Sequence, residues 1–145
     1  MIHLEKILIK EVMVTNLITI GMDEPFSRVW DVLRINKIRH LPVINDNGKL
    51  KGIITQRDLY RTVSPRKKVE EDGLFYLKQD LDKFILSSVM TEKVVTLSQN
   101  QSLGKALDVI VKRKFGCIPI VDEKGYLIGI VTQVDILRAI SKYFI

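Results

Sequence analysis

Several residue types that define special classes of protein are scarce in this chain of 145 residues. The single cysteine, Cys117, cannot form an internal disulfide, which excludes a disulfide-stabilised scaffold. There are only two histidines, and no residues have the spacing of a zinc site, so we expect no metal site. Apolar runs such as Tyr126–Val131 are far shorter than the roughly 20 residues of a membrane helix. The opening Met1–Lys6 is too polar for a signal peptide, and we expect a cytoplasmic protein.

What the chain does have is the composition of a globular protein, 46% hydrophobic and 28% charged, at a length that suits one compact domain or two small ones. Its 23 basic and 17 acidic residues give a net charge of +6, which favours polyanionic ligands or acidic surfaces. The basic residues are dispersed among acidic ones, and the sequence contains neither a helix-turn-helix signature nor an aromatic-rich basic strand. Nucleic acid is therefore an unlikely partner.

The dominant feature is an internal repeat. Shifting the sequence by 77 positions aligns Val12–Arg61 with Val89–Arg138 without a gap, and fifteen of the fifty positions are identical. Most other apolar positions exchange only among apolar residues. The chain is thus predicted to contain one structural unit as a tandem repeat.

Each copy predicts the same series of elements. The β-prone runs 17–20 and 94–97 come first. Asp23 and Asn100 then stand where a helix N-cap is expected, ahead of apolar residues at helical spacing. A hairpin follows, with strands at 41–44 and 50–54 in one copy and at 118–121 and 127–131 in the other, and a last helix opens after Thr55 or Thr132.

This order predicts an α+β fold of two β-α-β-β-α repeats. Because one repeat leaves a sheet face uncovered, we expect the two to pack as a pseudo-twofold intramolecular pair. The predicted division is 1–61 for the first repeat with its lead-in, 62–88 for a linker and 89–145 for the second repeat. The linker is expected to begin as a loop at Ser64-Pro65 and to end in a bridging helix through Leu77, Leu81, Phe84 and Ile85.

The motif with chemical content is Gly-Ile-Ile-Thr-Gln-Arg-Asp at 52–58, matched by Gly-Ile-Val-Thr-Gln-Val-Asp at 129–135. One interpretation is structural, since Thr-x-x-Asp is a capping box in which the Thr and Asp side chains bond each other's backbone amides. The other is functional: the helix terminus and the Thr hydroxyl would attract a phosphate, and the Asp would accept both hydroxyls of a ribose.

These motifs carry a family resemblance. The tandem pattern of Val-Met, Thr, an amphipathic helix, Leu-Pro-Val or Ile-Pro-Ile, a Gly turn and Gly-Ile-Ile-Thr-x-x-Asp closely resembles a pair of cystathionine-β-synthase (CBS) domains, or Bateman module. The likeness covers about nine tenths of the chain. Within the family, Arg39–Val43, Thr55-x-Arg57-Asp58 and Ser64-Pro65 look most like the stand-alone pair related to the acetoin-utilisation accessory protein.

The resemblance implies a regulatory module without catalysis that binds an adenosine-containing ligand in the cleft between its repeats. The ligand class would be AMP, ADP or ATP, with or without Mg²⁺, and S-adenosylmethionine or cyclic di-AMP is the alternative. Such a module would form a homodimer and signal to a regulated partner protein.

The resemblance also implies roles for individual residues. Asp58 and Asp135 would hold ribose hydroxyls, and Thr55 and Thr132 would contact ribose or phosphate. The adenine would lie against Ile38 and Phe115 and be read by backbone groups at Ile18 and Val95, and Arg39 and His40 would contact phosphate. Since the second copy has Gly116, Cys117 and Val134 where the first has Arg39, His40 and Arg57, we expect two pockets of unequal affinity.

The residues are also compatible with two other classes of function. A structural or protein-interaction module would retain Thr-x-x-Asp only as helix caps, with vestigial pockets. An enzyme is the weakest interpretation, because no set of nucleophile, base and orienting group recurs in the sequence. Cys117 occupies the position equivalent to His40, beside Ile118-Pro119, which suits a small, partly buried thiol better than a nucleophile.

Overall fold

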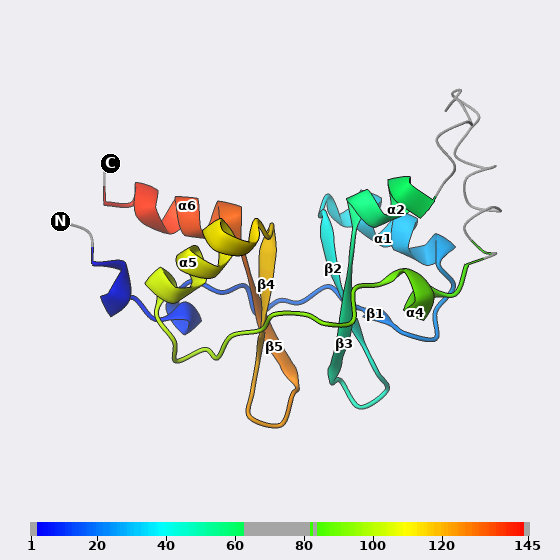
Figure 1. The fold of residues 1–145 in the computed structure, drawn as a ribbon, viewed down its shortest axis with the longest axis horizontal. Coiled ribbons are helices and arrows are strands. Elements are labelled where there is room, and N and C mark those ends of the chain that lie inside the picture. The colour runs from blue at the N-terminus through cyan, green and yellow to red at the C-terminus, as the bar shows by residue number, and fades with distance from the viewer. Residues whose placement is uncertain (1–2, 63–81, 83, 144–145) are drawn as a thin grey trace. The chain divides into compact units, whose positions relative to one another are not determined.

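The computed structural model describes residues 3–62, 82 and 84–143, and it is an α+β fold made of two compact units. The Asp58 unit is the continuous segment Ile18–Val94. The Asp135 unit combines Met1–Leu17 with Val95–Ile145. Figure 1 shows the elements of both units, which are described separately below.

The Asp58 unit has a three-stranded sheet in the order β1-β2-β3. Its strands are β1 (Ile20–Gly21), β2 (His40–Ile44) and β3 (Leu50–Thr55), and its helices are α1 (Ser27–Asn36), α2 (Gln56–Thr62) and α4 (Leu86–Val89). β1 pairs with β2 in parallel, and β2 pairs with β3 in an antiparallel hairpin. The core gathers apolar residues from the sheet and from all three helices, with Phe26, Leu41 and Ile54 fully buried.

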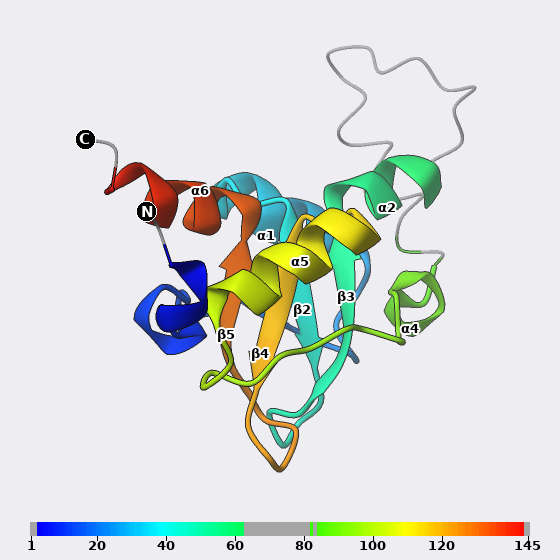
Figure 2. The ribbon, with the colours of Figure 1, turned by 60° about the vertical axis from the view of Figure 1, so that its left-hand side comes forward.

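The Asp135 unit is built around the antiparallel hairpin of β4 (Cys117–Val121) and β5 (Leu127–Thr132). α5 (Leu103–Arg113) packs against β4, and α6 (Gln133–Ser141) packs against β5 and α5, as Figure 2 shows. Two short 3-10 helices, η1 (Leu4–Lys6) and η2 (Ile9–Glu11), complete the unit. Within the described part of the chain, no helix has the length and apolarity that crossing a bilayer requires.

The predicted hairpins and the helices after Thr55 and Thr132 are confirmed. Each hairpin turn is fixed in the same way: the Oδ1 of Asn45 accepts from the backbone N–H groups of residues 47 and 49, and the Oδ1 of Asp122 accepts from those of residues 124 and 126. Gly48 and Gly125 have φ of 84° and 88°, where a glycine carries no steric cost. The identical glycines of the two copies are thus explained by turn geometry.

The starts of the two copies were predicted wrongly. The first strand is only Ile20–Gly21, and in the second copy only Leu97 pairs with the sheet, through a single parallel bridge to Ile120. Asp23 and Asn100 are not the N-caps, because the helices begin after Phe26 and after Ser102. Pro25 disfavours a helical conformation at residue 24, and the Oγ of Ser102 accepts from the backbone N–H of Lys105 at 3.1 Å.

The segments that lead into the two copies, together with the first residues of each copy, are exchanged between the units. Val14 pairs with Ile130 in the Asp135 unit, and the equivalent pair in the Asp58 unit joins Thr91 to Ile53. Ile9 is fully buried in the core of the Asp135 unit, where its N–H donates to the carbonyl of Gln101 at 2.9 Å. Each unit is therefore completed by the segment that leads into the other copy, including the first residues of that copy.

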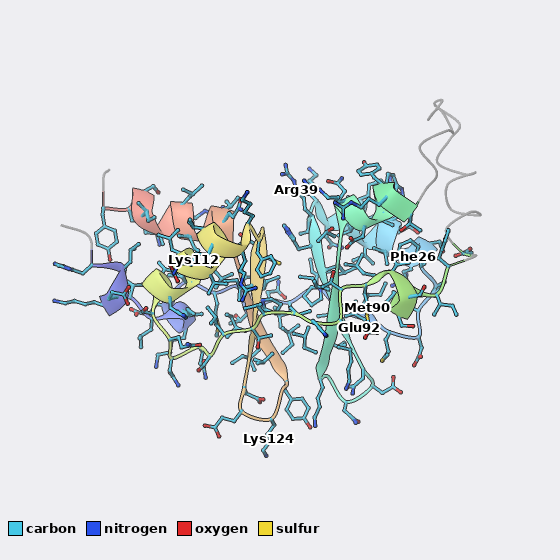
Figure 3. The ribbon with its side chains drawn as sticks, in the orientation of Figure 1. Phe26, Arg39, Met90, Glu92, Lys112 and Lys124 are labelled. Atoms are coloured by element: carbon cyan, nitrogen blue, oxygen red, sulfur yellow. The ribbon has the colours of Figure 1, made fainter. Side chains whose placement is uncertain are left out.

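A methionine packs on a glycine at each exchange. Met90 crosses Gly52 in the Asp58 unit, where Figure 3 shows it beside β3, and Met13 crosses Gly129 in the Asp135 unit. A Cβ added at Gly52 would lie 2.7 Å from the sulfur of Met90, and one at Gly129 would lie 2.6 Å from that of Met13. Both glycines are required by this close approach, and the repeated methionines are packing residues.

The exchange bears on the predicted division of the chain. That prediction grouped the lead-in with the first repeat, 1–61, whereas residues 4–14 pack within the Asp135 unit. The reason is that the apolar side chains of the lead-in are buried against α5 and β5. The boundaries 1–61, 62–88 and 89–145 remain a prediction about the repeats, and most of the predicted bridging helix lies outside the described residues.

Candidate functional site

Thr55 and Asp58 form a closed arrangement where β3 meets α2. The Oδ2 of Asp58 accepts from the backbone N–H of Thr55 at 2.8 Å and from its hydroxyl at 3.1 Å. The Oγ1 of Thr55 in turn accepts from the backbone N–H of Asp58 at 3.3 Å. The capping box predicted from the sequence is therefore present in this copy.

Thr132 and Asp135 repeat the same arrangement between β5 and α6. The Oδ2 of Asp135 accepts from the N–H and the hydroxyl of Thr132, both at 2.8 Å, and the Oγ1 of Thr132 accepts from the N–H of Asp135 at 3.2 Å. Asp135 is 8% exposed, and its Oδ1 lies 3.7 Å from the Nη1 of Arg138. In both copies the cap uses one carboxylate oxygen, so the other can accept a further hydrogen bond.

His40 and Cys117 lie opposite the two threonines. In the hairpins, His40 pairs directly with Thr55, and Cys117 pairs with Thr132. Directly paired residues project from the same face of an antiparallel sheet, with Cβ atoms about 5 Å apart. The structure thus brings the predicted phosphate contact His40 to the Thr55–Asp58 motif and places a thiol at the equivalent position of the second copy.

The surroundings of these two groups set their protonation. Burial lowers the pKa of His40 below its usual value, and the neighbouring guanidinium of Arg39 lowers that pKa further, because both disfavour a second positive charge. Burial raises the pKa of the Cys117 thiol to about 12. Near neutral pH the imidazole is therefore predominantly neutral and the thiol fully protonated.

Backbone hydrogen bonds tie the first residues of the hairpin to the start of the following helix. The N–H of Gln56 donates to the carbonyl of Arg39 at 2.9 Å, and the N–H of Gln133 donates to that of Gly116 at 3.1 Å. The Nε2 of Gln133 also donates to the carbonyl of Phe115 at 2.9 Å. The two glutamines were not predicted as part of the site, although their identity at the 77-residue offset was the available signal.

The remaining predicted residues divide between the two units. Arg39 and Arg57 are exposed, and Arg39, labelled in Figure 3, immediately precedes the first residue of β2. Ile18 and Ile38 are half-buried against the core of the Asp58 unit, and Val95 and Phe115 are half-buried in the Asp135 unit. The Asp58 unit thus holds every predicted cation, and the Asp135 unit holds none.

Two further features bear on what the site can do. Across the described residues, no group of three His, Cys, Asp or Glu side chains could hold a metal ion. A cavity of about 620 Å³ in the Asp135 unit lies between the 98–101 loop and the 121–126 turn. None of the predicted site residues lines this cavity.

The two copies of an α+β repeat, each with a capped Thr-x-x-Asp turn, define the class of protein. The sequence matches the family described as "CBS domain" over residues 9–65 and 86–142. The chain therefore belongs to the CBS-domain proteins.

Similar proteins share this organisation. A CBS domain-containing protein of Dictyostelium discoideum is 37% identical over 139 residues, which cover 94% of this chain and 93% of that protein. The CBS domain of a membrane protein from Sphaerobacter thermophilus has a TM-score of 0.77 at 27% identity, covering 93% of this chain and 88% of the other. The CBS domain pair of protein MJ0100, crystallised with 5′-methylthioadenosine and S-adenosyl-L-methionine, has a TM-score of 0.77 at 25% identity, covering 94% and 97%.

Proposed function

We propose that this chain is a regulatory ligand-sensing module that binds an adenosine-containing molecule and catalyses no reaction itself. The observation that carries the proposal is the Thr-x-x-Asp motif of each copy, in which the capping box occupies one carboxylate oxygen and leaves the other to accept from a ribose. The proposal is supported by the CBS domain pair of protein MJ0100, which is 25% identical to this chain and was crystallised with two adenosine compounds.

The proposed ligand class is AMP, ADP or ATP, with or without Mg²⁺, and S-adenosylmethionine or cyclic di-AMP is the alternative. The exposed guanidinium groups of Arg39 and Arg57 favour a phosphate-bearing ligand over S-adenosylmethionine, which carries a positive charge of its own. In the proposed function Asp58 and Asp135 bind ribose, and Thr55 and Thr132 contact ribose or phosphate. Backbone groups at Ile18 and Val95 read the edge of an adenine, and the side chains of Ile38 and Phe115 lie against its face.

The biological setting is proposed on the same basis. The module works in the cytoplasm as a homodimer and passes the state of its ligand to a partner protein. Its proposed kinship with the acetoin-utilisation accessory subgroup rests on residues 39–43, 55–58 and 64–65.

The test is calorimetric titration of the purified chain with AMP, ADP, ATP, S-adenosylmethionine and cyclic di-AMP, repeated with Asp58→Asn and Asp135→Asn. Asparagine keeps an oxygen for the capping box but replaces the second acceptor with a donor, so it removes the ribose bond at small cost to the fold. We expect at least one variant to bind about tenfold more weakly or worse, from the loss of hydrogen bonds to a charged group worth about 1.5–3 kcal/mol.

Asp108→Asn is the matched control, because it removes the same charge from the surface of α5, where Asp108 pairs with Lys112 at 2.9 Å. This variant should bind like the wild type. If no adenosine compound binds folded protein at millimolar concentration, the second candidate function holds, an interaction module whose motifs serve only as caps. That candidate is favoured by one observation, the complete capping box in both copies.

A further inference from the structure

The two copies differ in their capacity to exchange a proton with a ligand. At the strand position that pairs with the threonine of the motif, the first copy has an imidazole and the second has a thiol. His40, the first residue of β2, is half-buried next to the exposed Arg39, and its strand partner Thr55 bonds Asp58. Only the imidazole can change charge in the physiological pH range.

The elements next to β2 carry charges of both signs. Arg39 precedes His40 in the chain, and α2 carries Arg57 and Asp58, whose Oδ2 is already committed to Thr55. α1, which packs against β2, carries Arg34, which pairs with Asp31 at 3.8 Å. Burial and the guanidinium of Arg39 favour a neutral imidazole in the free site, and an arriving dianionic phosphate would reverse that preference.

We propose that His40 couples ligand binding to pH: it takes up a proton when a phosphate binds beside Arg39 and Thr55, so that the affinity for phosphate-bearing ligands rises as the pH falls. In this step the neutral imidazole takes a proton from solvent, and the resulting imidazolium forms an ion pair with the phosphate. No covalent bond between protein and ligand forms. This inference rests on the proposed function.

The second copy supplies the matched variant. His40→Cys installs the residue that the same fold tolerates at Cys117, where the thiol stays protonated because burial raises its pKa. His40→Gln keeps a hydrogen-bond donor but cannot titrate, and it guards against a folding defect in the first variant.

The experiment is calorimetric titration with AMP at pH 6, 7 and 8, each in two buffers of different ionisation enthalpy, which together give the protons taken up per ligand. Because the phosphate of AMP also titrates near pH 6, the measure is the difference between wild type and variant. Wild type should bind AMP about tenfold more tightly than either variant at pH 6, through a charge-assisted hydrogen bond, and should lose this advantage by pH 8. Adenosine, which carries no phosphate, should show no such difference.

A second readout is the NMR titration of His40, whose signals are assigned by their loss in His40→Gln. Its midpoint should lie below the usual value for histidine in the free protein, because of burial and Arg39, and should rise when AMP is added. If AMP binds but the His40 midpoint stays fixed, and wild type and His40→Cys take up the same number of protons, the inference is overturned and the proposed function stands. If AMP, ADP and ATP all fail to bind at any pH, the inference is overturned, and the proposed function falls with it only if S-adenosylmethionine and cyclic di-AMP also fail to bind.

Discussion

At the scale of single residues, the identities shared by the two copies are explained by backbone constraints as much as by ligand chemistry. Gly48 and Gly125 adopt positive φ, and Gly52 and Gly129 leave room for a methionine sulfur. Thr and Asp of each motif cap a helix. A repeated residue in this chain is therefore no evidence of binding until its structural role has been accounted for.

Gly129→Ala is expected to destabilise the protein by about 1–3 kcal/mol, because its new methyl group would overlap the side chain of Met13. The measurement is urea unfolding, analysed as a double-mutant cycle with Met13→Ala. Gly21→Ala is the control, since its Cβ would lie 3.6 Å from Oε2 of Glu24, an ordinary contact. Equal losses in Gly129→Ala and Gly21→Ala would contradict the steric explanation.

At the scale of elements, the hairpins and the helices that follow them could be predicted because their signals are local. A Gly turn stands between two apolar runs, and Thr-x-x-Asp stands at the helix start. The first strands could not be predicted, because β propensity at 94–97 says nothing about whether a partner strand lies within reach. Leu97 makes its one bridge to Ile120, and the backbone at residues 99 and 101 bonds the lead-in instead.

The ends of α1 and α5 have a backbone conformation that the residue pattern does not predict. α1 and α5 both end in a lysine with left-handed backbone, Lys37 at φ 53° and Lys114 at φ 56°. A side chain costs about 1–2 kcal/mol in this conformation, and glycine is the usual residue there. The lysines are identical in the two copies, but identity alone could not reveal their backbone conformation.

Lys114→Gly is accordingly expected to raise the stability of the chain by up to about 1 kcal/mol, part of the gain being lost to the greater freedom of glycine in the unfolded state. Thermal unfolding at fixed pH measures it. Arg113→Gly, at the last helical residue, removes the same charge and should instead destabilise the helix by up to about 1 kcal/mol. A lower melting temperature for Lys114→Gly would show that the side chain makes a contact worth more than the strain.

At the scale of the whole molecule, the family, the α+β class and the doubling of the unit could be read from the sequence, but the exchange of lead-in segments could not. Hydrophobic pattern shows that Ile9 is apolar without showing which copy buries it. The site is predictable to a similar degree. Spacing located the two Thr-x-x-Asp motifs, whereas the pairing of His40 with Thr55 depends on strand register.

Ile9→Ala tests the exchange. Because Ile9 is fully buried in the core of the Asp135 unit, the substitution should cost about 2–5 kcal/mol. Hydrogen exchange should show faster opening of β4 and β5, with β2 and β3 keeping their protection. Ile35→Ala, at a residue 69% exposed on α1, is the control and should change stability little. Loss of protection in β2 and β3 alone would contradict this assignment and show that the lead-in stabilises the Asp58 unit.

The exchanged lead-in also determines the order in which parts of the Asp135 unit become available during synthesis. Residues 4–14 precede the whole Asp58 unit on the chain, yet the residues they pack against, Gln99 to Leu103 and Ile130, follow it. On a ribosome, synthesis runs from the N-terminus, so the lead-in emerges before the Asp58 unit and waits until that unit has been made. The earliest apolar segment is thus among the last to be buried. In a circular permutant in which residues 95–145 directly precede residues 1–17, the two parts of the Asp135 unit would be made one after the other.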